Sequence, residues 1–246
     1  VELDGRARPV GGATQRTVLG RLVCAAGRPV TVDRLAQAVW GDRLPADPGH
    51  ALQSHVSRIR RALGDPARVV HTSAGYRLVL DDVHVDAHEV VALEARARDA
   101  AARGDLAGAG DAADVALDAW RGTPFADVRD SAAVRAEVVR LEEVSLSLRE
   151  LRARARLAAD AAGPLVPELT ALVREHPYRE GLWLLLARAL AAAGRTHEAL
   201  ECLRDLRSRL RAELGVDPGR DVDELYERLL RRDADDVAGA VPDLPG

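Results

Sequence analysis

The segment from Asp47 to Gly64 constrains the fold more than any other part of this chain of 246 residues. Asp47 can cap a helix, Pro48 suits the first helical position, and Gly64 stands where a glycine typically ends a helix. Between these limits apolar residues recur at the spacing of one buried helical face, at Leu52, Val56, Ile59 and Leu63. The sequence therefore predicts a helix over residues 48–63 with one face in a core.

Two amphipathic helices are predicted before this segment. One helical face is formed by Val18, Leu19, Leu22, Val23 and Ala26, and Gly27 is expected to stop that helix. A second helix is expected to begin after Thr31, whose hydroxyl can serve as N-cap, and to end at Trp40.

A β-hairpin is predicted after the third helix. Val69-Val70 and Tyr76-Arg77-Leu78-Val79-Leu80 have the composition of strands and bracket Ser73-Ala74-Gly75, a turn sequence. Residues 1–4 alternate as a strand would and start abruptly, so we expect that earlier strands have been cut away. Short strands, three helices and a hairpin are the order of a winged helix-turn-helix, predicted here for residues 1–82.

The exposed face of the third helix is the best candidate for a functional surface. A helix that enters the major groove needs side chains that reach base edges and phosphates, and arginine can grip guanine O6 and N7 together. The residues on this face and its flanks are Gln53, Ser54, His55, Ser57, Arg58, Arg60 and Arg61. A basic helical face is also compatible with a simple solvated surface; the cap before it and the hairpin after it favour DNA binding.

Charge is divided unevenly along the chain, whose net charge is -4. Residues 1–80 hold 12 arginines and 6 acidic residues, a net +6, whereas residues 81–246 hold 23 arginines and 33 acidic residues, a net -10. A basic first third suggests that this part meets a polyanion, although such asymmetry also arises by drift in an arginine-rich proteome.

The rest of the chain is predicted to be helical. Paired amphipathic helices from about Asp86 to Asp233 are separated by glycine-containing breaks near Gly104, Gly163 and Gly194. The last two breaks lie 31 residues apart, close to the period of about 34 residues of a tetratricopeptide repeat. The predicted fold class is mainly α: a winged helix, an all-α repeat domain over residues 86–233, and a tail or linker over residues 234–246.

Several classes of function are disfavoured by the residue types. All 35 basic residues are arginine, so the lysine of a P-loop and lysine-based catalysis are absent. Cys24 and Cys202 lie in apolar helical patterns, which predicts buried free thiols in a reducing compartment rather than a disulfide or a nucleophile. With no nucleophile–base arrangement in the sequence, we predict that the chain is not an enzyme and uses no cofactor.

The remaining candidates favour structural roles. The seven histidines show no ligand spacing with cysteine, so no metal site is predicted. Trp183 lies in an apolar helix and is expected in the core. No apolar run reaches the ~18 residues of a membrane span, and no signal peptide opens the chain, so we expect a cytoplasmic protein without a membrane partner.

Several longer strings of residues resemble one family. In the first third they are Gly11-Gly12-Ala13-Thr14-Gln15-Arg16, Val32 to Leu35, Val39-Trp40-Gly41, Leu52 to Gly64 and Gly75-Tyr76-Arg77-Leu78. In the remainder they are Ala119-Trp120-Arg121-Gly122, His176 to Glu180, Ala193-Gly194-Arg195, Glu198-Ala199-Leu200 and Glu213 to Gly219. The chain thus resembles the Streptomyces antibiotic regulatory protein family along nearly its whole length. The resemblance implies a winged-helix DNA-binding domain followed by a bacterial transcriptional activator domain of tetratricopeptide-like helices.

The resemblance also implies roles for individual residues. Arg58 would read base edges, His55, Arg60 and Arg61 would support or hold phosphates, and Trp40 and the wing residue Tyr76 would close on the DNA backbone. The full set of expected DNA-binding residues is Trp40, Gln53, Ser54, His55, Ser57, Arg58, Arg60, Arg61, Thr72, Tyr76 and Arg77. The chain departs from the family at Thr14, where a basic residue is common, and near Thr72, where the wing often carries an arginine. A minor-groove arginine contact is therefore not implied.

The implied partners are double-stranded promoter DNA with direct repeats, RNA polymerase holoenzyme and a second copy of the chain on DNA. One small domain makes few contacts, so tight binding is expected to need two copies on repeated half-sites. The loop from Asp42 to Asp47 corresponds to a segment with which such activators often touch polymerase. The resemblance implies activation of an antibiotic or other secondary-metabolite gene cluster.

A helical-repeat adaptor or ligand sensor, whose basic first domain only docks proteins, is the alternative from another class. The operator, the target genes, a ligand of the helical domain, the oligomeric state away from DNA and further domains stay open at this point.

Overall fold

The computed structural model describes the backbone of residues 2–3, 6–7 and 9–239 and the side chains of residues 9–231. The chain divides into two compact units, of which the first comprises Val1–Ala92 and Asp118–Ser145 and the second Leu93–Leu117 and Leu146–Gly246. Two long helices, α4 (Asp86–Ala102) and α6 (Arg135–Ala158), contribute residues to both units. The compact units therefore divide the chain differently from the boundary expected near residues 82–86, which stays a prediction.

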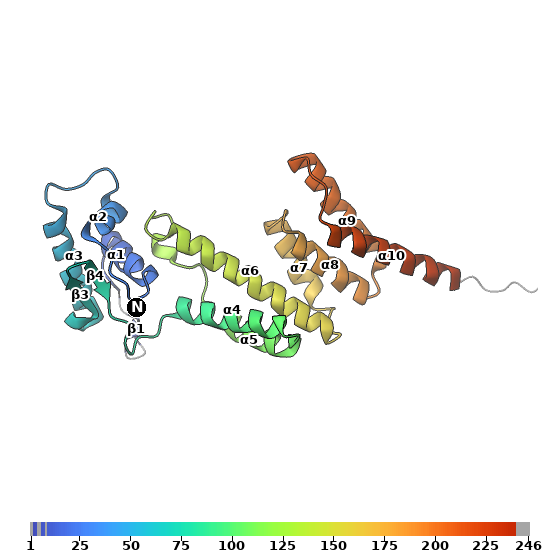
Figure 1. Cartoon of the computed structure of the whole chain (residues 1–246), viewed down its shortest axis with the longest axis horizontal. Coiled ribbons are helices and arrows are strands. Elements are labelled where there is room, and N and C mark those ends of the chain that lie inside the picture. Colours follow the sequence, from blue (N-terminus) through green and yellow to red (C-terminus); the bar gives the residue numbers. More distant parts are fainter. Residues whose placement is uncertain (1, 4–5, 8, 240–246) are drawn as a thin grey trace, which may run out of the picture. The chain divides into compact units, whose positions relative to one another are not determined.

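Three short helices and a hairpin open the first unit (Figure 1). The elements are β1 (Glu2–Leu3), β2 (Arg6–Ala7), α1 (Ala13–Cys24), α2 (Val32–Trp40), α3 (Pro48–Leu63), the 3-10 turn η1 (Pro66–Arg68), β3 (Val69–Thr72) and β4 (Gly75–Leu78). Strand β1 pairs antiparallel with β2, and β3 pairs antiparallel with β4. Helices α1, α2 and α3 pack against one another. This arrangement confirms the predicted winged helix-turn-helix.

The ends of α2 and α3 follow from local capping chemistry. The Thr31 hydroxyl accepts the backbone N–H of Arg34 at 3.3 Å, and the Asp47 carboxylate accepts that of His50 at 2.9 Å. Each side chain satisfies one of the backbone donors that a helix leaves unpaired in its first turn. Gly64 closes α3 with a φ of 72°, a left-handed conformation that suits glycine. The predicted limits of both helices are confirmed.

Helix α1 ends earlier than the sequence predicts. A stop at Gly27 is expected from the glycine, but the last helical residue is Cys24. Ala26 already has a φ of 48°, so the chain leaves the helix before it reaches Gly27. Ala26 is exposed and does not continue the buried stripe.

One apolar cluster holds the winged helix together. It combines the predicted buried stripe of α3 with residues from α1, α2 and both wing strands; its members include Val18, Leu22, Leu35, Leu52, Val56, Ile59, Val69, Tyr76 and Leu78. Full burial of a side chain of this size stabilises a fold by about 1.5–3 kcal/mol. Leu63, the last residue of the predicted stripe, is half-buried and packs on the edge of the cluster.

The hairpin is tied to the segment before α2. Val30 donates its N–H to the Tyr76 carbonyl at 2.8 Å and accepts the Tyr76 N–H at 2.9 Å, so it acts as a third partner of the hairpin. Gly75 makes this approach possible, because an added Cβ would lie 2.1 Å from the Val30 carbonyl oxygen. The turn itself is Ser73-Ala74, shorter than the predicted three-residue connection.

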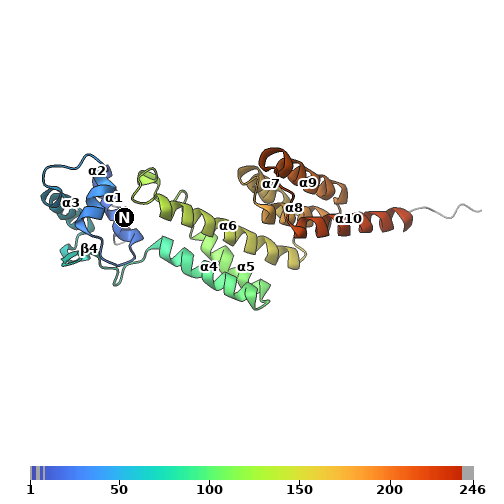
Figure 2. The ribbon, with the colours of Figure 1, turned by 45° about the horizontal axis from the view of Figure 1, so that its top comes forward.

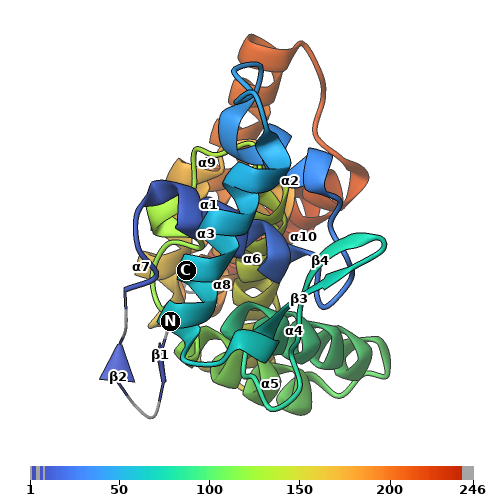
Figure 3. The same cartoon turned by 90° about the vertical axis from the view of Figure 1, so that its left-hand side faces the viewer.

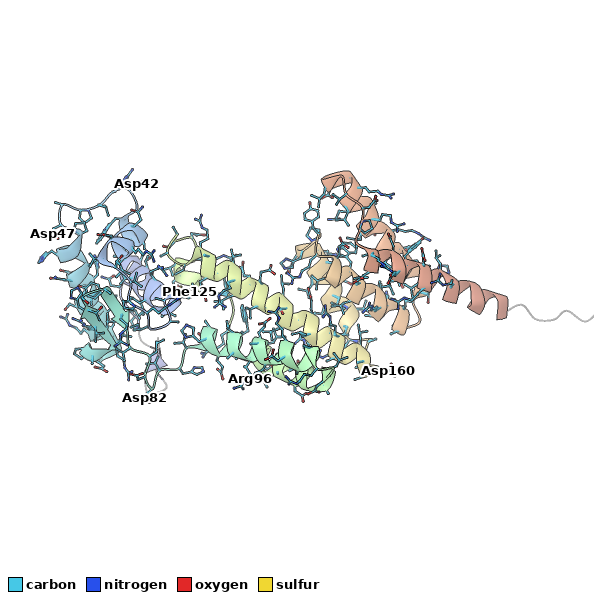
Figure 4. All side chains as sticks on the ribbon, viewed as in Figure 1. Asp42, Asp47, Asp82, Arg96, Phe125 and Asp160 are labelled. Atoms are coloured by element: carbon cyan, nitrogen blue, oxygen red, sulfur yellow. The ribbon has the colours of Figure 1, made fainter. Side chains whose placement is uncertain are left out.

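The first unit also contains the segment that leads into α6. The turn η2 (Ala126–Val128) packs against α1, and an added Cβ on Gly20 would come within 3.1 Å of Val134 Cγ1. An apolar cavity of about 180 Å³ lies in this unit, with Trp120 and Phe125 among its lining residues. Phe125, labelled in Figure 4, has a φ of 52°.

The second unit is built of helical hairpins (Figure 2). Besides parts of α4 and α6 its elements are α5 (Leu106–Asp118), α7 (Leu165–Glu175), α8 (Glu180–Ala192), α9 (Thr196–Arg209), the π-helical turn η3 (Leu210–Leu214) and α10 (Arg220–Gly239). Helix α8 packs against α7, α9 and α10. It is buried on almost every side, as its continuous apolar sequence predicts, and Trp183 donates its indole N–H to the Pro177 carbonyl at 3.0 Å. The all-α repeat fold is confirmed.

The predicted breaks between helices coincide with the observed loops, but the end of the chain differs. Helix α10 continues through Gly239, whereas a tail is expected from residue 234. No glycine or proline interrupts this mixed-charge stretch before Gly239, which explains why the helix continues. Residues 240–246 lie outside the described residues.

Both cysteines are free, as predicted; Cys202 is buried as expected, whereas Cys24 is only half-buried. Burial raises the pKa of the Cys24 thiol to about 11 and that of the Cys202 thiol to about 12. Thiols with such pKa values are poor nucleophiles at neutral pH.

Candidate nucleic-acid interface

Helix α3 has one buried and one exposed face, and this helix lies at the front in Figure 3. Besides His50 in its first turn, the exposed residues of α3 are Gln53, Ser54, Ser57, Arg58 and Arg61. They belong to the predicted DNA-binding set, and the structure brings them together on one side of a single helix. The buried residues Leu52, Val56 and Ile59 anchor this helix to the rest of the winged helix.

The arginines of the exposed face have no acidic neighbours on their own helix. Helix α3 contains Arg58, Arg60 and Arg61 but no Asp or Glu. Within the described side chains, residues 9–231, no carboxylate forms an ion pair with Arg58 or Arg61. Two exposed guanidinium groups whose charge is not neutralised by a carboxylate, and whose N–H donors are not occupied by one, are suited to bind anions.

His55 lies at the edge of this face and is held from two sides. Its Nδ1 is 3.0 Å from Nε2 of Gln15 in α1, and its ring centroid is 6.1 Å from that of Trp40 in α2. Burial, with a smaller contribution from the positive charge of Arg58, lowers the pKa of His55 below its ordinary value of 6.5. Sequence reasoning missed Gln15, although a polar residue among the apolar positions of an amphipathic helix is a signal of a specific partner.

Arg60 is half-buried and already engaged. Its Nε donates to the backbone carbonyl oxygen of Val69 at 2.7 Å, which links α3 to strand β3. This hydrogen bond to the wing therefore fixes the orientation of the Arg60 guanidinium group, including its terminal nitrogens.

The three predicted wing residues differ in their surroundings. The Thr72 hydroxyl donates to the Gly75 carbonyl at 3.0 Å and accepts the Ala74 N–H at 3.2 Å, so it shapes the turn. Arg77 is half-buried. Tyr76 is only 4% exposed, burial raises its pKa, and its ring packs 4.7 Å from that of His71. The structure places Tyr76 in the core, and the DNA contact implied for it stays a prediction.

The loop between α2 and α3 is exposed at its tip. Asp42 and Asp47, labelled in Figure 4, stand near its two ends. Arg43 and Leu44 lie between them, and Leu44 is 52% exposed. A single exposed apolar side chain is common on protein surfaces, so Leu44 does not by itself mark a protein contact.

Metal-ligand clusters and membrane-spanning helices are absent from the described part of the chain. Among the described side chains, no group of three or more His, Cys, Asp or Glu residues lies close enough to hold a metal ion. None of the described helices combines the length and the apolar character needed to cross a membrane.

Comparison with known proteins agrees with this geometry. Residues 10–78 match the family "Transcriptional regulatory protein, C terminal", and residues 85–230 match "Bacterial transcriptional activator domain". Regulatory protein DnrI of Streptomyces peucetius is 36% identical over 228 residues, which cover 89% of this chain and 84% of DnrI. The chain belongs to the Streptomyces antibiotic regulatory protein family.

Members of this family regulate transcription, and the winged-helix match contains the whole predicted set of DNA-binding residues. The transcriptional regulatory protein EmbR of Mycobacterium tuberculosis is 37% identical over 236 residues, covering 94% of this chain and 61% of EmbR. The structure of EmbR in complex with a low-affinity phosphopeptide matches with a TM-score of 0.87 at 35% identity, covering 94% of this chain and 62% of that one. The chain thus spans about three fifths of the length of EmbR.

Proposed function

We propose that this chain binds promoter DNA sequence-specifically, with α3 in the major groove, and activates transcription there. The observation that carries the proposal is the exposed face of α3, where Arg58 and Arg61 have no acidic partner among the side chains of residues 9–231. The major groove is about 12 Å wide and admits a single helix, whose exposed side chains then reach base edges and phosphates.

The residues of this face have different tasks. Arg58 reads a base edge, because a guanidinium can bind guanine O6 and N7 together. Arg61, the terminal nitrogens of Arg60, His55 and Trp40 contact the sugar-phosphate backbone. Such phosphate contacts fix the register of the helix without reading sequence.

Arginines in the second unit support the assignment by contrast. Arg149 and Arg152 both pair with Glu168, and Arg179 pairs with Glu150. These cations are neutralised within the fold, whereas Arg58 and Arg61 stay available for an external anion. Other exposed arginines of the second unit, such as Arg96, also have no ion pair among the described residues, so the assignment rests on the placement of Arg58 and Arg61 on one exposed face of α3.

Tight binding requires two copies of the chain. A single winged helix buries about 600–1,000 Å² of protein surface on DNA, too little for strong discrimination. Two copies on direct repeats double the base contacts, and the helical domain proposed for residues 86–233 joins them. The winged helix proposed for residues 1–82 supplies the DNA contact.

RNA polymerase holoenzyme is the proposed second partner. The loop of residues 42–47, which directly precedes α3, presents the exposed side chains of Arg43 and Leu44, and the family resemblance suggests it as the polymerase contact. Family membership further suggests that the regulated genes belong to an antibiotic or other secondary-metabolite cluster. Because the proposed partner is promoter DNA, we propose that the protein acts in the cytoplasm.

Binding selection from a library of random duplexes tests the proposal. The wild-type chain should enrich a repeated motif, and the complex should weaken steeply with added salt. Arg58→Ala should cost about 1–3 kcal/mol and relax preference at one base position per half-site. Arg61→Ala should weaken all sequences alike and reduce the salt slope by about one.

Arg96→Ala is the matched control, since Arg96 is an exposed arginine of α4 outside the interface (Figure 4). It should leave the selected motif and the salt slope unchanged. If the wild-type chain enriches no motif, the adaptor class is favoured instead; if Arg58→Ala retains the full motif, Arg58 does not read bases.

A further inference from the structure

The side chain of Gln15 has an orientation that the backbone determines. Gln15 is only 6% exposed, and the N–H of Gly12, at the start of α1, donates to its Oε1 at 3.0 Å. A backbone N–H can only donate, so the amide oxygen must face Gly12. The amide nitrogen therefore faces the other way, toward α3.

The amide nitrogen of Gln15 in turn determines where His55 carries its proton. Nε2 of Gln15 lies 3.0 Å from Nδ1 of His55. An amide NH2 group donates and does not accept, so Nδ1 must be the unprotonated, accepting nitrogen. The proton of a neutral His55 is then on Nε2.

The other ring nitrogen is open. His55 is half-buried, Nε2 forms no hydrogen bond with a described residue, and it does not belong to the buried polar atoms without a partner. It is therefore accessible to solvent or to DNA.

We infer that Gln15 is a positioning residue of the DNA contact, which holds His55 as the neutral Nε2–H tautomer so that the imidazole donates a hydrogen bond to a phosphate oxygen. The inference rests on the proposed function, because the phosphate belongs to the bound DNA. Gln15 itself stays buried and touches no DNA.

The surroundings of His55 favour the neutral form. Arg58 on α3 is the charged group that acts on His55, and the groups that face it from α1 and α2, Gln15 and Trp40, are neutral. A cationic imidazole would also turn an Nδ1–H against the amide NH2 of Gln15. Burial, the charge of Arg58 and the amide therefore act in the same direction, and lower the pKa of His55.

NMR of the chain without DNA, labelled with 15N-histidine, measures the tautomer directly. His55 should show a protonated Nε2, an unprotonated Nδ1 and a pKa below 6.5. Gln15→Met keeps the size of the side chain but has no donor, so both tautomers of the neutral ring should appear. Thr17→Val, which alters another buried polar side chain of α1, should leave the His55 signals unchanged.

The NMR spectrum of the wild-type chain tests the inference even if Gln15→Met fails to fold. A wild-type His55 with its proton on Nδ1, or with a pKa of 6.5 or above, overturns the inference. So does a folded Gln15→Met chain with unchanged His55 signals.

DNA binding then tests whether the tautomer serves the contact. On the motif selected by the wild-type chain, Gln15→Met should weaken binding about two- to tenfold at pH 8, the size of one hydrogen bond. Its binding should recover toward pH 6, where the imidazolium forms, while the wild-type affinity changes little. Gln15→Glu can accept from both Gly12 N–H and a protonated Nδ1, so it should raise the His55 pKa and restore a pH-dependent contact.

The two hypotheses fail in different ways. A wild-type chain that binds no duplex overturns the proposed function. A wild-type chain that binds its motif, together with a Gln15→Met chain of the same affinity at both pH values, overturns the role of Gln15 alone.

Discussion

Gly75 is the wing residue at which one added methyl group should disrupt the hairpin. It begins β4 with a φ of 121°, a conformation that L residues rarely adopt. An added Cβ would lie 2.1 Å from the Val30 carbonyl oxygen and 2.8 Å from Thr31 Cα. Both are backbone atoms, so no side-chain rotation can relieve the contact.

The cost of Gly75→Ala can be worked out from these distances. The backbone strain of an L residue at this φ is about 1–3 kcal/mol. Relief of the clash also requires β4 to move away from Val30, which breaks the two hydrogen bonds of 2.8 and 2.9 Å between Val30 and Tyr76. At about 1 kcal/mol each, they bring the expected loss of stability to about 3–5 kcal/mol.

Hydrogen exchange of the full chain measures this loss locally. Peptides that contain Val30 and Tyr76 should exchange more than about a hundredfold faster in Gly75→Ala. Gly27→Ala is the matched control: its φ of 78° is also positive, but its Cβ would meet nothing closer than 3.9 Å. That variant should lose only about 1–2 kcal/mol. Equal exchange in the two variants would refute the reasoning from backbone contact.

Three further predictions concern single groups. Asp47→Ala should lower the free energy of unfolding by about 1 kcal/mol, because the His50 N–H loses its cap, and Asp47→Asn should restore most of it in urea unfolding; two equally unstable variants would contradict this. Cys202, with a pKa raised to about 12, should react with Ellman's reagent at pH 8 far more slowly in the folded chain than in urea, and equal rates would show that it is accessible. Burial and Arg58 lower the pKa of His55, so near pH 6 the unfolded chain binds more protons than the folded chain. The free energy of unfolding should therefore fall as the pH falls from about 7 to 5.5, and a slope that His55→Gln leaves unchanged would exclude His55 as its cause.

Much of the fold could be predicted because its signals are local. Thr31, Asp47 and Gly64 act on helix ends through atoms a few residues away, so their identity and spacing suffice to place α2 and α3. The buried stripe of α3 follows from periodicity in the same way. These predictions need no knowledge of the rest of the chain.

Features that depend on tertiary contacts are missed or misplaced by sequence reasoning. The end of α1 is assigned to Gly27, because nothing in the sequence shows that Ala26 takes a positive φ. The pairing of Val30 with Tyr76 joins residues 46 positions apart, and the contact between Gln15 and His55 spans 40. Hydrophobic periodicity describes one element at a time and carries no information about such pairs.

The two neighbouring arginines of α3 need different readouts when the DNA interface is mapped by mutation. Arg60 and Arg61 are adjacent residues of the same type, and the sequence alone does not distinguish their roles. In the structure Arg60 donates to the Val69 carbonyl at 2.7 Å, whereas Arg61 is exposed. Arg60→Ala therefore removes a positive charge and a link to the wing together, while Arg61→Ala removes the charge alone. Both should reduce the salt slope of DNA binding by about one, and Arg60→Ala alone should speed hydrogen exchange in β3. A loss of affinity in Arg60→Ala thus identifies a phosphate contact only if the salt slope also changes; with an unchanged slope the loss arises from a displaced wing.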